Sequence, residues 1–248
     1  DFETKLENYN ILEFQQISNS FNEMTVRIET LIKEVYETQL LVKEARLQYL
    51  QAQINPHFMF NVLTMIAIKV KKHRDEELYQ TVTSFAGLMR GKLFRRNEVE
   101  IKLKEEMEIA GFYLYLQSER FKDIITYNIE WESDEIKECY VPRLCIEPIV
   151  ENAVIHGLEP KGTEGRIRVA IREASEDSIN IVVEDDGVGF NVNEMDDRKD
   201  NKNPRVGIMN IQRLIRNLYG DKYGVLFQSE IGKGTIVTVC LPMRKDRT

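Results

Sequence analysis

Apolar residues recur along this chain with two different periods. Up to about residue 122 they recur at spacings of three, four and seven, which is typical of amphipathic helices. Beyond residue 123 they recur at every second position in several segments, which is typical of strands with one covered face. The change of period predicts a domain boundary near residues 95–105.

The segment 17–50 contains neither glycine nor proline and predicts one long helix. Its apolar seam repeats in heptads and consists of Ile28, Leu31, Val35, Val42 and Ala45. Because a helix with one seam cannot bury that seam against itself, the pattern predicts a partner helix. A parallel homodimer is the favoured interpretation, and a helical hairpin within one chain is the alternative.

The same helical pattern runs into a histidine that directly follows a proline, Pro56-His57. A proline inside a helix removes a backbone hydrogen bond and costs about 3 kcal/mol, so we expect a kink at Pro56. Taken alone, His57 between Ile54 and Phe58 is more typical of a packed structural residue than of a catalytic one.

Two further helices are predicted after this histidine. The first runs to a charged break at 71–77, and the second carries apolar residues from Leu78 to Gly91. Helices joined by a short polar turn pack antiparallel, and a second subunit would complete a four-helix bundle. A third helix, Lys104 to Phe121, is expected to pack across to the next domain.

The last part of the chain predicts a sheet covered on one side by helices, an α/β sandwich. The expected strands lie at 125–131, 167–171, 179–183 and 236–240, with helices at 144–157 and 207–219 between them. The predicted fold class is therefore a long helix and a helical hairpin followed by this sandwich.

Composition narrows the range of functions. The chain has 248 residues, 42% of them hydrophobic, and a net charge of −7, so it can form a core and has no excess of basic residues for nucleic acid. Three distant cysteines, Cys139, Cys145 and Cys240, are expected to be buried and unpaired, as in a reducing compartment. No apolar run is long enough to span a membrane, so the sequence in hand is expected to be soluble.

Two polar groups in the last domain suggest a nucleotide site. Asn152 and His156 lie one helical turn apart, and an amide oxygen suits Mg²⁺ that already carries water and phosphate oxygens. Asp185, Gly187 and Gly189 follow a strand, where a carboxylate can accept from an amine and glycines allow close approach to a flat ring. Alone, this D-x-G-x-G pattern is typical of an ordinary turn.

A third group is Gly207, which opens a helix whose free amides can hold phosphate. The polar segment before it, 191–202, fits either a solvated loop or a mobile lid.

Two further segments accompany these three groups: Gly232-Lys233-Gly234-Thr235 precedes the last strand, and Pro56-His57-Phe58-Met59-Phe60-Asn61 lies upstream. With its motifs in this order, the chain resembles sensor histidine kinases of the LytS/YesM class. The resemblance covers about residues 14–242, and the segment 14–24 resembles the second helix of a HAMP linker. It implies a HAMP-like helix at 1–40, a dimerisation and phosphotransfer hairpin at 41–100, and an ATP-binding domain of the histidine kinase/Hsp90 type at 101–248.

The resemblance implies that His57 accepts the γ-phosphoryl group of Mg-ATP and passes it to an aspartate of a response regulator. Asn61 matches the position of a water-orienting residue in kinases with phosphatase activity. In the ATP domain, Asn152 would hold Mg²⁺ and Asp185 would read the adenine amine. The remaining nucleotide-binding residues implied are His156, Gly187, Gly189, Gly207, Asn210, Gly234 and Thr235, with Thr235 supporting Asp185.

Two positions depart from the more familiar pattern. Phe58 stands where an acid often follows the histidine, and Arg205 stands where an additional glycine is usual.

The resemblance also implies a homodimer and a parent protein anchored in the cell membrane, of which this chain is the cytoplasmic portion.

Two alternatives remain open at this stage. One is an ATP hydrolase of the gyrase/Hsp90 group, which would need a glutamate at the position of Pro148. The other is a non-catalytic signalling scaffold with a degenerate pocket.

Overall fold

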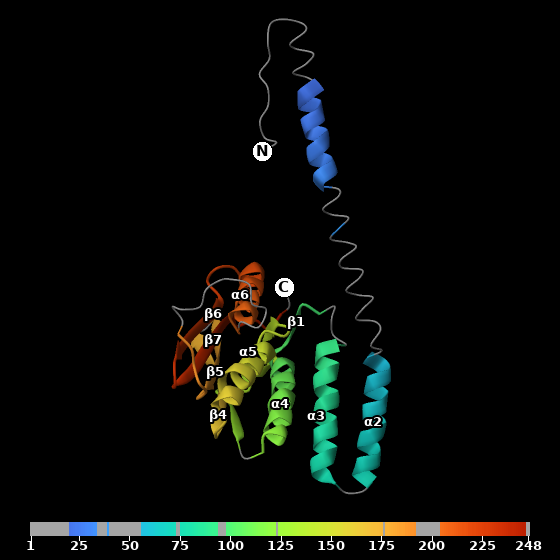
Figure 1. The fold of residues 1–248 in the computed structure, drawn as a ribbon, viewed down its shortest axis with the longest axis vertical. Coiled ribbons are helices and arrows are strands. Elements are labelled where there is room, and N and C mark those ends of the chain that lie inside the picture. Colours follow the sequence, from blue (N-terminus) through green and yellow to red (C-terminus); the bar gives the residue numbers. More distant parts are fainter. Residues whose placement is uncertain are drawn as a thin grey trace, which may run out of the picture. The chain divides into compact units, whose positions relative to one another are not determined.

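A computed structural model describes residues 20–33, 39, 56–72, 75–93, 98–122, 124–175, 177–191 and 204–246. The chain divides into two units, 1–55 and 56–248, which are considered separately. In the first unit, residues 20–33 form a helix on which Leu31 is exposed (Figure 1). The later seam positions and the residues just before Pro56 lie outside the described residues, so the dimer seam and the kink stay predictions.

The second unit begins with a helical hairpin, as predicted. Helix α2 spans Pro56–Lys72 and packs against α3, Glu76–Leu93. The Oδ1 atom of Asp75 accepts a hydrogen bond from the amide of Leu78 at 3.0 Å, which caps the start of α3. The short connection therefore turns the chain back on itself, and the start of α2 lies at the same end of the hairpin as the end of α3 (Figure 1).

Helix α3 packs closely on α4, Leu103–Arg120, through two glycines one turn apart. A Cβ atom at Gly87 would overlap the ring of Phe112, and one at Gly91 would lie 2.5 Å from Ile109. Only glycine at these positions lets the two helices approach so closely.

The end of α3 is also held by polar contacts. The Nη2 atom of Arg143 donates to the carbonyl oxygens of Gly91 at 3.0 Å and Lys92 at 2.8 Å, which satisfies carbonyls that the helix itself leaves free. The ammonium group of Lys92 lies 2.7 Å from Oε1 of Glu147. These contacts join the hairpin to the helix that begins at Glu147.

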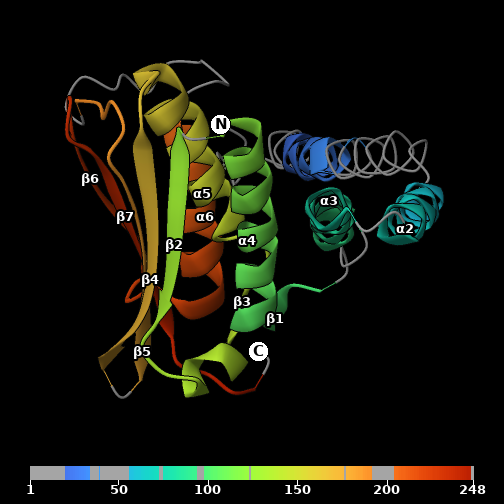
Figure 2. The same ribbon diagram turned by 90° about the horizontal axis from the view of Figure 1, so that it is seen from below.

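The rest of the unit is an α/β sandwich, which confirms the predicted fold class. Its five-stranded sheet has the order β2-β4-β5-β7-β6, in which only the β2/β4 pair is parallel. Helices α4, α5 and α6 cover one face of this sheet (Figure 2). The strands are β2 Ile125–Trp131, β4 Gly165–Ser175, β5 Ser178–Asp185, β6 Gly224–Glu230 and β7 Gly234–Pro242.

The helices of the sandwich are α5, Glu147–Asn152, and α6, Pro204–Tyr219. Helix α5 continues as a π-helical turn over Ala153–Leu158 and a 3₁₀ turn over Glu159–Lys161, and another 3₁₀ turn spans Glu135–Glu138. The short strands β1, Glu100–Lys102, and β3, Tyr140–Pro142, form a separate antiparallel pair.

The core lies between the sheet and its helices. It consists of fully buried aliphatic side chains, each of which contributes about 1.5–3 kcal/mol by leaving water. Examples are Ile149 and Val150 of α5, Ile215 of α6, and Ile167, Ile181 and Val239 of the sheet. All three cysteines are free; Cys139 and Cys145 are buried, whereas Cys240 is only partly covered. Of the helices in the described ranges, none has the length and apolar character needed to cross a membrane.

Candidate active site

A pocket lies between the end of α5 with its π-helical turn and the neighbouring strands β5 and β7. It brings together side chains from both predicted groups: Asn152 and His156 from the helix, Asp185 from β5 and Thr235 from β7. Ile149, Ala153, Gly157, Val183, Gly189, Phe190, Ile208 and Val237 complete its lining. The cavity that these residues enclose has a volume of about 30 Å³.

Asp185 is the buried acid of this pocket, with 5% of its surface exposed. Its Oδ1 atom accepts a hydrogen bond from the amide of Gly187 at 2.9 Å. Burial raises the pKa of Asp185 to about 6, against the opposing effect of the amides of Gly187 and Thr235, which favour the carboxylate. At neutral pH the group is therefore an ionised acceptor held in an apolar pocket.

The glycines around Asp185 allow backbone segments to touch. A Cβ atom at Gly187 would overlap the backbone of Gly157, and one at Gly234 would overlap the carbonyl oxygen of Asp185. Gly189 has a φ of 59°, and a Cβ atom there would overlap the carbonyl oxygen of Glu230. The loop after β5 is thereby fixed against both the helical turn and the β6/β7 turn.

A buried carboxylate on α4 positions the start of α5. The two oxygens of Glu106 accept hydrogen bonds from the amides of Leu144 at 2.9 Å and Ile146 at 3.0 Å. Leu144 has a φ of 56°, a conformation that costs about 1–3 kcal/mol for a residue other than glycine. Burial raises the pKa of Glu106, while these amides lower it. The strained turn is thus held by hydrogen bonds at the entry to the helix that carries Asn152.

The start of α6 lies beside Asn152. The Nδ2 atom of Asn152 would be 3.4 Å from a Cβ atom at Gly207, and Ile208 reaches into the pocket. Asn210, which the sequence also assigns to the nucleotide, is exposed on α6. The preceding segment 192–203 lies outside the described residues, so the lid stays a prediction.

The two predicted residues of the hairpin lie in α2. His57 is in the first turn of the helix, and its side chain is outside the described part of the chain. Asn61 follows one turn later and is exposed.

Sequence reasoning missed one polar residue next to the pocket, Ser229 of β6. Its Oγ atom accepts a hydrogen bond from the amide of Phe190 at 2.9 Å and lies 2.9 Å from Oγ1 of Thr235. A serine in a strand gives no sequence signal, and only the pairing of β6 with β7 places it here.

Metal ligands are few at this site. Over the residues whose placement the structure describes, no group of three or more His, Cys, Asp and Glu side chains could hold a metal ion. A cation here would take one amide oxygen from Asn152 and its remaining ligands from water or from a bound ligand.

The sandwich, the asparagine at the end of α5 and the buried acid at the end of β5 define a nucleotide-binding domain. Comparison with known families agrees with this class. Residues 142–245 match the model of the histidine kinase-, DNA gyrase B- and HSP90-like ATPases, and residues 45–125 match the histidine kinase model.

Relatives identify the family more narrowly. The chain is 32% identical to the sensor histidine kinase YesM of Bacillus subtilis, over 93% of this chain and 39% of that protein. It is 29% identical to the sensor histidine kinase YpdA of Escherichia coli, over 83% of this chain and 37% of that protein. It is also 29% identical to the sensor protein LytS of Oceanobacillus iheyensis, over 85% of this chain and 37% of that protein. The chain belongs to the sensor histidine kinases of the YesM/LytS class and spans less than half the length of these relatives.

Proposed function

We propose that this chain is the kinase portion of a two-component sensor, which phosphorylates itself on His57 from Mg-ATP. The observation that carries the proposal is the convergence of Asn152, Asp185 and Thr235 on one pocket, in a chain whose hairpin carries His57 in the first turn of α2. The phosphoryl group then passes to an aspartate of a response-regulator protein.

In this proposal Asp185 binds the exocyclic amine of adenine. An ionised carboxylate only accepts hydrogen bonds, and the amine offers two donors. The apolar side chains Ile149, Val183 and Val237 around Asp185 suit the flat faces of the base.

Asn152 would hold Mg²⁺ through its amide oxygen, and the ATP phosphates and water would supply the other ligands. Gly207 lies beside Asn152 in the first turn of α6, where free backbone amides favour anions. His156, on the π-helical turn, and Asn210, on the next turn of α6, would complete the phosphate end of the site. The bound ion would neutralise charge on the phosphates.

The reaction is an in-line displacement. A nitrogen of His57 forms a bond to the γ-phosphorus, the bond to the β–γ bridging oxygen breaks, and ADP leaves. Because such a transition state asks for little covalent chemistry, positioning and charge neutralisation by the pocket provide most of the catalysis. Phe58 directly follows His57, in the position where an acid is more familiar. A phenylalanine cannot accept the imidazole proton, so another group must accept it.

The structure also favours a kinase over an ATP hydrolase. Pro148 occupies the position where the hydrolases carry a glutamate, and it cannot activate water. Glu147 and Glu151 lie one turn apart on the face of α5 that meets Lys92, at 2.7 Å and 3.7 Å. The pocket is lined from another face of this helix, so neither glutamate lines it.

A homodimer is part of the proposal. Helix α2 exposes Met65, Ile66 and Ile68, and a cavity of 640 Å³ lies between α2, α3 and Phe112 of α4. An apolar helix face of this kind suits two further helices in a four-helix bundle. Sedimentation of the chain as a monomer at high concentration would contradict this part.

We further propose that the parent protein is a membrane-anchored sensor with this chain in the cytoplasm. The HAMP-like segment 14–24 and the sensor relatives support this placement. Fractionation of cells that express the full-length gene product tests it, since recovery in the soluble fraction would contradict the anchor.

The central experiment is labelling with γ-³²P-ATP. The wild type and a His73→Ala control are expected to take up acid-labile, alkali-stable label, whereas His57→Ala takes up none. Label that persists in His57→Ala would overturn the proposal.

Asn61 is proposed to orient water for phosphatase activity on the phosphorylated partner, because it is exposed one turn after His57. The variant Asn61→Ala should still label itself but dephosphorylate the regulator more slowly. An unchanged dephosphorylation rate would remove this role.

A further inference from the structure

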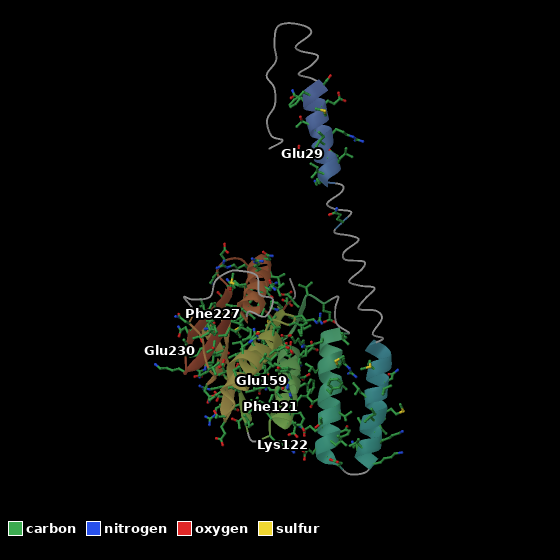
Figure 3. All side chains as sticks on the ribbon, viewed as in Figure 1. Glu29, Phe121, Lys122, Glu159, Phe227 and Glu230 are labelled. Carbon is green, nitrogen blue, oxygen red and sulfur yellow. The ribbon has the colours of Figure 1, made fainter. Side chains whose placement is uncertain are left out.

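The hydroxyl group of Ser229 is the centre of a hydrogen-bond network behind Asp185. Ser229 lies on β6 between Phe227 and Glu230, which are labelled at the edge of the sheet in Figure 3. Its Oγ atom accepts from the amide of Phe190 at 2.9 Å. The same atom lies 3.1 Å from the carbonyl oxygen of Gly234 and 2.9 Å from Oγ1 of Thr235.

The number of hydroxyl protons on Ser229 and Thr235 determines which group donates in each of these hydrogen bonds. A serine hydroxyl has one proton, and a carbonyl oxygen only accepts. All three contacts are hydrogen bonds at once only if Ser229 donates to Gly234 and Thr235 donates to Ser229. The single hydroxyl proton of Thr235 is then directed into the network.

This direction determines what Thr235 offers to a ligand. Thr235 lines the pocket, and it is the strand partner of Asp185 in the β5/β7 pair. With its proton directed to Ser229, its Oγ1 atom presents only lone pairs, next to a carboxylate that also only accepts. A base that brings an amine to this position is favoured, as adenine does, while guanine brings a carbonyl oxygen that both acceptors repel.

We propose that Ser229 is a specificity-determining positioning residue, which selects adenine over guanine nucleotides by taking the proton of Thr235. The proposal rests on the proposed binding of the base beside Asp185. It adds a residue from the neighbouring strand that does not itself line the pocket.

The test is the ratio of the dissociation constants of GTP and ATP, each measured with Mg²⁺ on the whole chain. In Ser229→Ala, the hydroxyl of Thr235 is free to turn its proton toward the base. The ratio is expected to fall about tenfold, as the loss of one well-placed acceptor implies. Ser229→Thr keeps the hydroxyl and should keep the ratio.

A matched control is Ser178→Ala, which removes another serine hydroxyl from the same sheet. Ser178 lies at the start of β5, and its hydroxyl pairs with that of Ser175 at 2.6 Å, away from the pocket lining. This variant should bind both nucleotides like the wild type. If Ser229→Ala does not fold by thermal melting, Ser229→Cys carries the test, because a thiol of similar shape accepts hydrogen bonds only weakly and should lower the ratio as well.

An unchanged ratio of the two dissociation constants in Ser229→Ala would overturn the proposal while the nucleotide site stands. If both nucleotides bound equally more weakly, Ser229 would only support the structure of the site; if neither changed, it would have no part in binding. Failure of the site itself is recognised differently. It would appear as a wild type that does not bind ATP, or as an Asp185→Asn variant that binds ATP as well as the wild type, and it would overturn both proposals.

Discussion

Lys92, at the end of α3, forms an ion pair of 2.7 Å with Glu147, the first residue of α5. The carboxylate of Glu147 is almost fully buried, and Lys92 is its charge partner. Among the described residues, the Oε1 atom of Glu147 has no hydrogen-bond partner of good geometry. Because α3 belongs to the histidine hairpin and α5 ends at Asn152, this pair joins the hairpin to the nucleotide pocket.

Replacement of Lys92 by methionine is expected to destabilise the chain by about 2 kcal/mol. This is less than the about 3–5 kcal/mol of a fully buried pair, because Lys92 keeps 35% of its side chain in solvent. Burial raises the pKa of Glu147 and Lys92 lowers it, so the variant raises this pKa further.

The loss of stability should therefore appear at neutral pH. It should vanish as the pH falls below about 4.5, where the carboxyl is protonated in both the folded and the unfolded chain. Chemical denaturation at several pH values measures it. In a Glu147→Gln background the same substitution should have little effect, and a full loss there would show that the ion pair is not its cause.

Replacement of Asp185 by asparagine is expected to weaken ATP binding about 10- to 100-fold, because an acceptor is replaced by an amide donor. It should also stabilise the chain without nucleotide. Burial raises the pKa of Asp185 from 3.8 to about 6, so ionisation costs the folded wild type about 3 kcal/mol at neutral pH.

The stabilisation by Asp185→Asn should grow as the pH rises from about 4 to about 6, and it should be absent at lower pH. ATP binding to the wild type should weaken below pH 6, because Asp185 is then protonated and is no longer an ionised acceptor. Calorimetric melting and nucleotide titration measure the two effects. A variant that is less stable than the wild type at pH 8 would contradict the account.

Replacement of Gly189 by alanine should abolish ATP binding and cost about 3 kcal/mol or more, because the new methyl group would overlap the carbonyl oxygen of Glu230. Gly162→Ala is the matched control. Gly162 has a similar φ of 65° but open space around it, so its substitution should cost only about 1 kcal/mol and leave ATP binding intact. Equal effects of the two substitutions would show that backbone strain alone explains them.

The sequence predicted those elements whose apolar residues recur with a regular period. The helical periods of the hairpin and the alternation in β2, β4, β5 and β7 gave the fold class. The order of the motifs predicted a common nucleotide site for Asn152 and Asp185, and both residues line one pocket in the structure; their roles stay predictions.

The parts that were missed depend on contacts between distant residues. In β6, the consecutive apolar residues Val225, Leu226 and Phe227 hide the period of two. Leu226 lies on the exposed face of this strand, whereas its two neighbours pack against the core. Glu106 caps a turn 38 residues later in the chain, a pairing without a local signal. The contact between Ser229 and Thr235 likewise forms only once β6 pairs with β7.

The most direct test of the central claim is to locate the phosphoryl group after incubation with Mg-ATP. The protein is digested under alkaline conditions, which preserve phosphohistidine, and the peptides are sequenced by mass spectrometry. The account predicts a single modified peptide with the phosphoryl group on His57, absent when Asn152 is replaced by alanine. Modification of another residue, or release of ADP and phosphate without a phosphorylated peptide, would contradict it.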